Sequence, residues 1–217
     1  MKNKISLFRQ CEVETMETKT EETKTDQKRR AIRQAAADCF ARYGYDKTTL
    51  DDIGKVIRLN KASLYYYYKN KEELFIDVVL QESAAFMTDL MTKVATIDDP
   101  AEQISTYLTE RLRYYKQVLN LHSLSIENLQ TLEPQFEQLY TSVLQQELDF
   151  LETLMRKAIP PSEDARQLAS LLLNVADALK HKAVRDAGFG PTHAIDYSEV
   201  EHETRLLTKL ILQGVNA

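Results

Sequence analysis

Apolar residues recur at intervals of three and four along most of this chain, which is the period of an α-helix with one buried face. The first such pattern ends at Gly44, and glycine commonly closes a helix. Its apolar positions are Ile32, Ala35, Ala36, Cys39, Phe40 and Tyr43. Next, Leu50, Ile53 and Ile57 predict a helix of about two turns, which is followed by a second short helix and then by a long one.

Residues that favour helix N-termini stand at the start of these three segments. Thr49 and Asp52 have the spacing of a capping box. Asn60 is a favourable N-cap for the next helix, and Asn70 with Glu73 repeats the capping spacing at the start of the long one. About three residues separate the two short helices, so the pair meets at a steep angle and predicts a helix-turn-helix whose second helix enters a major groove of DNA.

The rest of the chain is rich in helix-forming residues, and strand-like alternation is poor. We predict six further helices, over Lys71–Val94, Pro100–Asn120, Ser123–Leu132, Pro134–Lys157, Ser162–Arg185 and Ser198–Gln213. The predicted breaks are Asp98-Asp99-Pro100, Glu133-Pro134 and Pro160-Pro161, and the longest loop opens at Gly188–Pro191. The expected fold is all-α, with about nine helices.

Composition divides the chain into three parts. Residues 1–25 are rich in Lys, Glu and Thr and are expected to form a disordered tail. Residues 26–72 are expected to form the helix-turn-helix domain, and residues 73–217 a larger helical domain. No segment approaches about 18 uncharged apolar residues, so we expect a cytoplasmic protein with no membrane span. Cys11 and Cys39 do not predict a structural disulfide, and Cys39 is expected in the core.

The charge of the chain is unevenly distributed. Residues 28–74 contain eleven Lys or Arg and six Asp or Glu, a net charge of +5, whereas the whole chain has a net charge of −5. The remainder therefore has a net charge of −10. A basic module on an acidic body favours DNA contact through one end of the molecule only.

The stretch from Thr49 to Leu74 resembles the DNA-binding region of the tetracycline repressor (TetR) family of bacterial transcription regulators, over about an eighth of the chain. The shared positions are Thr49, Ile53, Gly54, Leu64, Tyr65, Tyr67, Tyr68, Lys69, Lys71, Glu72 and Leu74. Arg58 stands where the family usually has a turn glycine, and a left-handed conformation there costs about 1 to 2 kcal/mol. The resemblance implies a homodimeric repressor that a small-molecule effector releases from a pseudo-palindromic operator on double-stranded DNA.

The second short helix and its flanks hold the candidate DNA contacts. Lys61, Ala62, Ser63 and Tyr66 are expected to face base edges, whereas Leu64 and Tyr68 are expected to pack inward. Thr48, Thr49, Lys69 and Lys71 are expected to contact phosphates. Tyr65 and Tyr67 have two interpretations, since a phenol can donate to a phosphate or fill the joint between helices.

The larger domain is expected to form a dimer and hold the effector. The last two predicted helices have a broad apolar surface, made by Leu168, Leu171, Leu172, Val175 and Leu179 with Val200, Leu207, Leu210 and Ile211. The family resemblance implies a four-helix dimer interface there, and an ordinary monomeric core is the alternative. Candidate effector-binding residues are Phe86, Met87, Tyr107, Arg111, Tyr114, Tyr115, His122, Phe136, Tyr140, Asn174 and Asp177. The tyrosines with Arg111 and His122 suggest an amphipathic aromatic or anionic ligand.

Two other classes of protein are the alternatives. An enzyme is disfavoured, because the chain has no Gly-rich phosphate loop, no nucleophile elbow and no Cys or His cluster at metal spacing, and no cofactor is expected. Glu199 and His202 have the spacing of one half of a carboxylate metal site, but a single such pair is expected to be a solvated helix start. The other alternative is a helical protein-binding adaptor without DNA binding, which the basic head argues against.

Overall fold

The structure of the chain, a computed structural model, describes residues 23–161 and 164–215. Within these ranges it forms nine α-helices and one short 3-10 helix, with a single isolated β-bridge between Ser125 and Pro191, so the expected all-α fold is confirmed. The elements are α1 (Lys24–Tyr43), α2 (Leu50–Val56), α3 (Lys61–Tyr67), α4 (Lys71–Val94), α5 (Pro100–Leu121), α6 (Ile126–Leu139), α7 (Thr141–Ala158), α8 (Ala165–Asp186), η1 (Thr192–Ala194) and α9 (Ser198–Val215).

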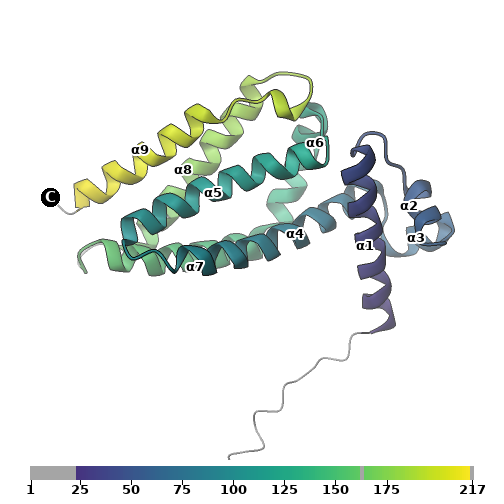
Figure 1. The fold of residues 1–217 in the computed structure, drawn as a ribbon, viewed down its shortest axis with the longest axis horizontal. Helices are drawn as coiled ribbons and strands as arrows, with labels where there is room; N and C mark the ends of the chain where they lie inside the picture. The colour runs from purple at the N-terminus through teal and green to yellow at the C-terminus, as the bar shows by residue number, and fades with distance from the viewer. Residues whose placement is uncertain (1–22, 162–163, 216–217) are drawn as a thin grey trace, which may run out of the picture.

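The first three helices form a small head at one end of the molecule, and α4 runs from this head into an elongated body (Figure 1). Residues from all four helices share one apolar core: Ile32, Ala36 and Phe40 of α1, Ile53 of α2, Leu64 of α3, and Leu74 and Phe75 of α4. Cys39 is buried in the same core, as expected. Because α4 belongs to both head and body, a movement of α4 is a movement of the head.

The helix starts in the head are set by the predicted caps. The Thr49 hydroxyl accepts a hydrogen bond from the Asp52 amide at 3.2 Å, and the Asp52 carboxylate accepts one from the Thr49 amide at 3.2 Å. The Asn60 side chain accepts from the Ser63 amide at 2.8 Å, which caps α3. The Asn70 side chain caps α4 in the same way. Each cap satisfies an amide that helix geometry leaves unpaired.

The turn between α2 and α3 brings two backbone segments into close contact. Arg58 has a φ of 54°, which is the left-handed conformation that the family's usual glycine accommodates more easily. A Cβ on Gly54 would lie 2.7 Å from the Leu59 carbonyl oxygen and 3.1 Å from a Leu64 methyl group. Position 54 therefore requires glycine if α3 is to pack this closely on α2.

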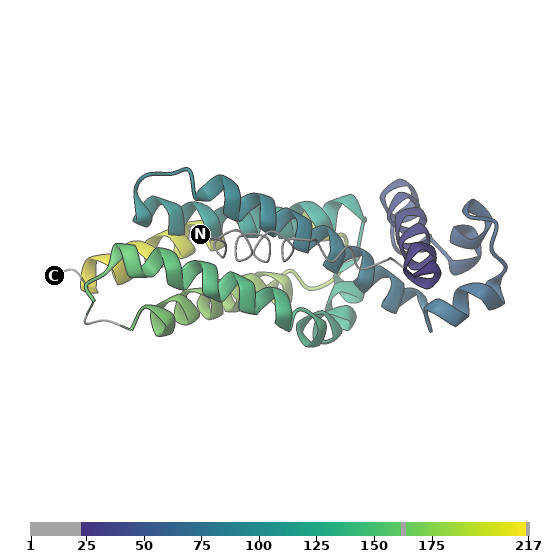
Figure 2. The ribbon, with the colours of Figure 1, turned by 90° about the horizontal axis from the view of Figure 1, so that it is seen from below.

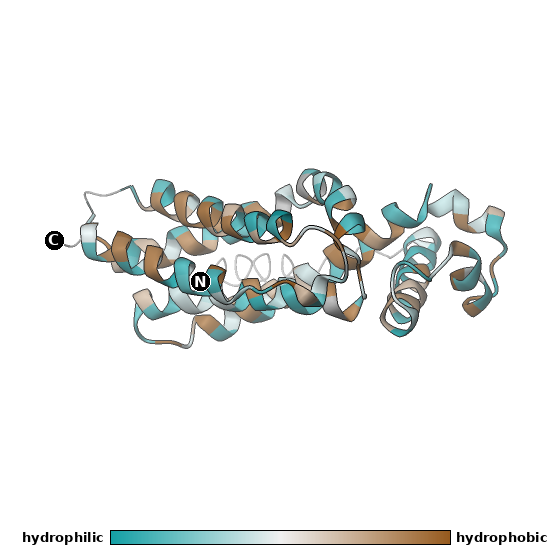
Figure 3. Ribbon diagram, turned by 90° about the horizontal axis from the view of Figure 1, so that it is seen from above, coloured by the Kyte–Doolittle hydropathy of each residue, from teal (hydrophilic) through white to brown (hydrophobic). Residues whose placement is uncertain are grey.

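The body is a bundle in which α6 lies at the end next to the head (Figures 1 and 2). Its second apolar core includes Val94, Ile104, Tyr107, Leu151, Met155 and Leu172. Seen from the side of α9, the helices of the body show hydrophobic positions among polar ones (Figure 3).

Some predicted helix boundaries were wrong. Pro134 lies inside α6, and the boundary with α7 falls at Tyr140 instead. Proline removes one backbone hydrogen bond, but Leu129, Leu132 and Phe136 continue one buried or half-buried face across it, and their burial keeps the helix intact. The structure also starts α6 at Ile126 rather than Ser123, because Ser125 provides the cap.

The starts of α1 and α8 differ by a few residues from the predicted positions. Thr23 caps α1, which starts at Lys24, so the helix includes the last residues assigned to the tail. Asp164 caps α8, whose start at Ala165 replaces the predicted start at Ser162. The disordered tail was predicted over residues 1–25, and its residues 1–22, with Cys11 among them, lie outside the described residues.

Candidate functional site

The outer surface of α3 is the first candidate site. Leu64 and Tyr68 are buried against α1, α2 and α4, which is the inward packing that their spacing predicts. On the other side, Tyr66 is 78% exposed and Tyr65 is 46% exposed. Lys61 and Ala62 are also exposed, and Ser63 is half-buried. The first turns of α3 thus present a mixed cationic, aromatic and small-residue surface to the solvent.

The two ambiguous tyrosines of α3 differ in their surroundings. Tyr65 is exposed, and the Lys61 ammonium lies 5.9 Å from the centre of its ring. Tyr67 is half-buried against the head core, and its carbonyl accepts a hydrogen bond from the Arg29 guanidinium at 3.0 Å. The Tyr67 side chain is therefore partly covered by the head core, whereas the Tyr65 ring reaches the solvent.

The four residues expected to contact phosphates differ in their exposure to solvent. The expectation for Thr48 is wrong: its side chain is buried, and its hydroxyl donates to the Gly44 carbonyl at 2.7 Å, which ties the α1–α2 loop together. Thr49 caps α2 on the exposed surface. Lys69 is exposed, while the Lys71 ammonium donates to the Tyr45 carbonyl at 3.0 Å and lies over the Tyr45 ring.

The second candidate site is a cavity of about 470 Å³ inside the body. Eight of the eleven residues expected to bind an effector line it: Met87, Arg111, Tyr114, Tyr115, Phe136, Tyr140, Asn174 and Asp177. Most other lining residues are apolar, such as Val79 of α4, Leu112 of α5 and Leu129 of α6. An apolar cavity with a few polar groups is typical of a small-molecule site.

The other three residues lie away from the cavity. Phe86 stacks on the Tyr114 ring at 3.8 Å between centroids. Tyr107 is buried and donates its hydroxyl to Glu147 at 3.0 Å. His122 is buried where the body meets the head, against Phe40 and Phe75. The apolar surroundings that suggested a ligand site are core packing at Tyr107 and His122, whereas Phe86 is half-buried and packs on a residue of the cavity wall.

A buried ion network forms part of the cavity wall, which Arg111 and Asp177 line. The Arg111 guanidinium donates to Glu147 at 2.6 and 3.3 Å and to Asp177 at 2.8 and 3.3 Å. Burial opposes the charge of Arg111, but these two carboxylates outweigh it and raise the pKa of Arg111 further above its usual value. Burial likewise opposes the charge of Asp177, but Arg111 and then Lys180 hold the pKa of Asp177 well below its usual range.

Sequence reasoning missed Glu147, whose side chain is fully buried. A signal for it exists, because Glu147 lies four residues from both Val143 and Leu151 on the apolar stripe of α7. A carboxylate in such a stripe requires a buried cationic partner. The sequence also did not identify Glu133, which lines the cavity. A Glu133 carboxylate oxygen lies 3.0 Å from His181 Nε2.

The joint between body and head is built around His122. Its ring meets the rings of Phe40 and Phe75 edge-on, at centroid distances of 6.3 and 5.4 Å. Its Nε2 lies 3.1 Å from Glu82, and its carbonyl accepts the Tyr45 amide at 2.7 Å.

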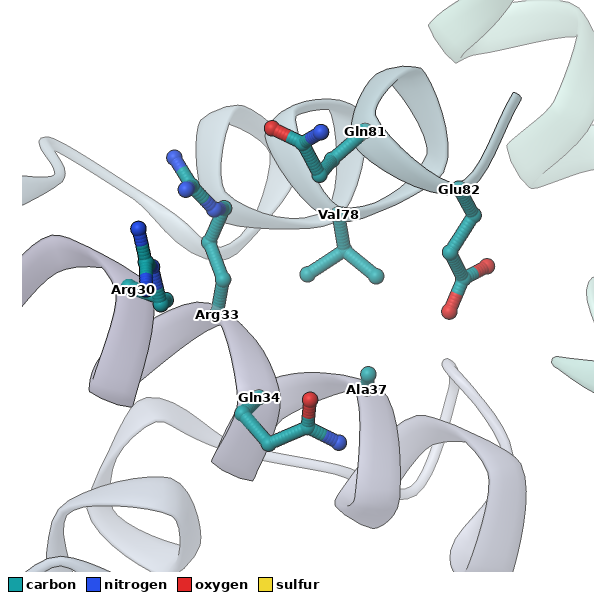
Figure 4. A pocket seen from close by; sticks show the side chains of 7 residues that line it. All are labelled: Arg30, Arg33, Gln34, Ala37, Val78, Gln81 and Glu82. Atoms are coloured by element: carbon teal, nitrogen blue, oxygen red, sulfur yellow. The ribbon is translucent and has the colours of Figure 1, made fainter. Parts of the chain in front are cut away.

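A second contact between head and body lies nearby, where α1 and α4 enclose an open groove of about 400 Å³ (Figure 4). Arg33 and Glu82 are among the residues that line it. Arg33 spans the two helices through an ion pair with Asp77 at 3.3 Å.

Within residues 23–161 and 164–215, no helix is long and apolar enough to cross a membrane. No group of three or more His, Cys, Asp or Glu side chains in the same part is arranged to hold a metal ion.

The head is similar to known DNA-binding domains. The profile of the family described as "Bacterial regulatory proteins, tetR family" matches residues 32–78. The icaADBC biofilm operon negative regulator IcaR of Staphylococcus epidermidis is 58% identical over 40 residues, which are 18% of this chain and 22% of that protein. The regulator RutR of Escherichia coli is 39% identical over 54 residues, 25% of this chain and 26% of RutR. The chain thus matches about a quarter of the length of these relatives.

Longer matches extend into the body. The probable acrEF/envCD operon repressor of Escherichia coli is 26% identical over 134 residues, 60% of each chain. Among solved structures, a transcriptional regulator from Cytophaga hutchinsonii has a TM-score of 0.68 at 23% identity and covers 88% of this chain and 100% of its own. A TetR-family regulator from Pectobacterium atrosepticum has a TM-score of 0.62 at 17% identity and covers 89% of this chain and 96% of its own. These two likenesses concern the fold.

Proposed function

Because the chain belongs to the tetR family of bacterial regulatory proteins, we propose that it is a sequence-specific DNA-binding transcriptional regulator. We further propose that it acts as a homodimeric repressor that a small molecule releases from its operator. The observation that supports DNA reading most directly is the exposed surface of α3, which is capped at Asn60 and anchored by Leu64 and Tyr68. This anchoring holds the helix rigidly while its other side stays free for a major groove.

The proposed contacts follow from exposure. Lys61, Ala62, Ser63 and Tyr66 face the bases, and Tyr65, Thr49 and Lys69 face the phosphates. Lys71 donates to the neutral Tyr45 carbonyl and therefore keeps its positive charge, which attracts the DNA backbone. Tyr67 acts through packing at the α1–α3 joint, and Thr48 is excluded from the contact set because it is buried.

Dimerisation is proposed through α8 and α9. Leu171 of α8 and Leu206 and Leu210 of α9 are 46%, 45% and 57% exposed. Exposed leucines on neighbouring helices favour burial against a second copy. A symmetric dimer places two α3 helices in successive major grooves, which lie about 34 to 36 Å apart on a pseudo-palindromic site.

The segment between Val118 and Leu124 supports the proposed release mechanism. Val118 and Leu124 line the cavity, while His122 between them holds the Tyr45 amide of the head. Phe75 also lines the cavity and packs on the His122 ring. A ligand that displaces this wall therefore displaces the head, and it releases DNA if it favours the displaced arrangement.

The test is selection of operator sequences. The purified chain is incubated with random DNA duplexes at two salt concentrations, and the retained duplexes are sequenced. We expect a pseudo-palindrome with salt-sensitive affinity, because phosphate binding releases counterions. No enrichment at low salt would overturn the proposal and favour a protein-binding adaptor.

Variants of the contact residues sharpen the result. Tyr66→Ala should weaken operator binding about 5- to 150-fold and relax the sequence preference. This range corresponds to the loss of a base contact that contributes about 1 to 3 kcal/mol of binding free energy. Lys69→Ala should weaken all sequences alike and reduce the salt slope by about 1. The control is Lys93→Ala, which removes an exposed lysine at the far end of α4 and should change neither property.

A further inference from the structure

Both permanent cations of the cavity are already neutralised by the protein. Arg111 directs its hydrogen bonds to Glu147 and Asp177, as described above. The Lys180 ammonium lies 3.2 Å from Asp177 and 4.5 Å from the centre of the Tyr115 ring. An anionic ligand would have to displace a buried carboxylate from Arg111 and leave that carboxylate unpaired, which is costly.

The carboxylates outnumber these cations. Glu133 and Asp177 line the cavity and Glu147 lies behind Arg111, so three carboxylates face the two cations Arg111 and Lys180. Counted over these permanently charged side chains, the difference is one negative charge. Glu133 pairs with His181, whose Nε2 lies 3.0 Å from its carboxylate, rather than with either permanent cation.

The rest of the lining suits the apolar part of such a ligand. Tyr114, Tyr115, Phe136 and Tyr140 line the cavity beside aliphatic side chains such as Leu112. Aromatic faces attract cations that have been removed from water.

We infer that the cavity binds an amphipathic organic cation, with its charge near Glu133 and its apolar part among the aromatic side chains. This inference rests on the proposed effector function and replaces the anionic ligand that Arg111 had suggested. It follows from the pairing of Arg111, which only the tertiary structure reveals.

The test uses two ions of similar size and shape and opposite charge, tetraphenylphosphonium and tetraphenylborate. Their binding to the purified full chain is measured by titration calorimetry without DNA. We expect the cation to bind about tenfold more tightly or better. Equal or tighter binding of the anion, or binding of neither ion, would overturn the inference.

Two variants locate the charge. Glu133→Gln should lower the affinity for the cation about fivefold or more and reduce the preference over the anion. The control is Glu127→Gln, on an exposed position of the same helix outside the cavity, which should leave both affinities unchanged. Equal effects of the two variants would refute a specific role for Glu133. Thermal unfolding of each variant shows whether the fold is retained.

Operator release is measured separately by fluorescence anisotropy of labelled DNA. If the cation binds but the operator stays bound, the ligand class stands and the release mechanism fails. If only the anion releases the operator, the regulator stands and the ligand class fails.

Discussion

Replacing Arg111 with methionine tests the buried ion network, which shapes the cavity and its charge. Methionine keeps much of the length of the side chain and removes the guanidinium. Glu147, which is fully buried, then loses two charge-assisted hydrogen bonds and keeps the Tyr107 hydroxyl as its donor. Asp177 keeps Lys180 as a partner, so the main penalty falls on Glu147.

Breaking a buried ion pair on one side costs about 3 to 5 kcal/mol, because it leaves an uncompensated charge in the interior. For a chain of 217 residues, each kcal/mol lowers the melting temperature by about 2 to 4 °C, so Arg111→Met should lower it by about 6 to 20 °C. The free energy of unfolding is measured by urea denaturation at pH 7 and one fixed protein concentration.

The double variant Arg111→Met with Glu147→Gln separates charge from packing. Glutamine retains an oxygen for the Tyr107 hydroxyl and removes the stranded charge. The double variant should therefore be more stable than Arg111→Met alone by about 1 to 3 kcal/mol. The reasoning is refuted if Arg111→Met costs less than about 1 kcal/mol, or if the effects of the two substitutions simply add.

Three further predictions concern the same structure. The pKa of Asp177 is lower in the folded than in the unfolded chain, so ionised Asp177 contributes stability that is fully present above about pH 5 and is lost as the pH falls through the folded-state pKa. The free energy of unfolding should therefore fall below about pH 5, and Asp177→Asn should make that fall less steep. Thr48→Val should lower the free energy of unfolding by about 1 to 3 kcal/mol because it leaves the Gly44 carbonyl unpaired, whereas Thr48→Ser should not; a Thr48→Val protein of normal stability but weak DNA binding would contradict the buried role. Leu210→Glu should shift the chain from dimer to monomer in light scattering, and an unchanged dimer would exclude α9 from the interface.

The head was the more predictable part of the fold. Thr49, Asn60 and Asn70 each cap a helix through an amide three residues away, so their role depends only on local sequence. The spacing of Leu64 and Tyr68 likewise indicates which side of α3 is buried. The exposed contact surface follows from the same spacing, with Thr48 as the exception, because its hydroxyl turns inward to a loop carbonyl.

The effector cavity was predictable only in part. Aromatic and polar residues at helical spacing identified much of its wall, but the same pattern describes a core residue such as Tyr107. Periodicity shows that a side chain is buried and does not show whether a cavity or another side chain lies beside it. Pro134 illustrates the converse, because a local helix breaker was outweighed by the burial of the residues around it.

Local sequence therefore suffices for the helices, the caps and the orientation of α3, since these depend on residues within about one turn of each other. Tertiary structure decides the charge of the cavity. Arg111 meets Glu147 and Asp177 across separations of 36 and 66 residues, and no local pattern specifies which carboxylate will reach which cation. The same holds for His122, whose ring lies between Phe40 of α1 and Phe75 of α4, far from it in the sequence.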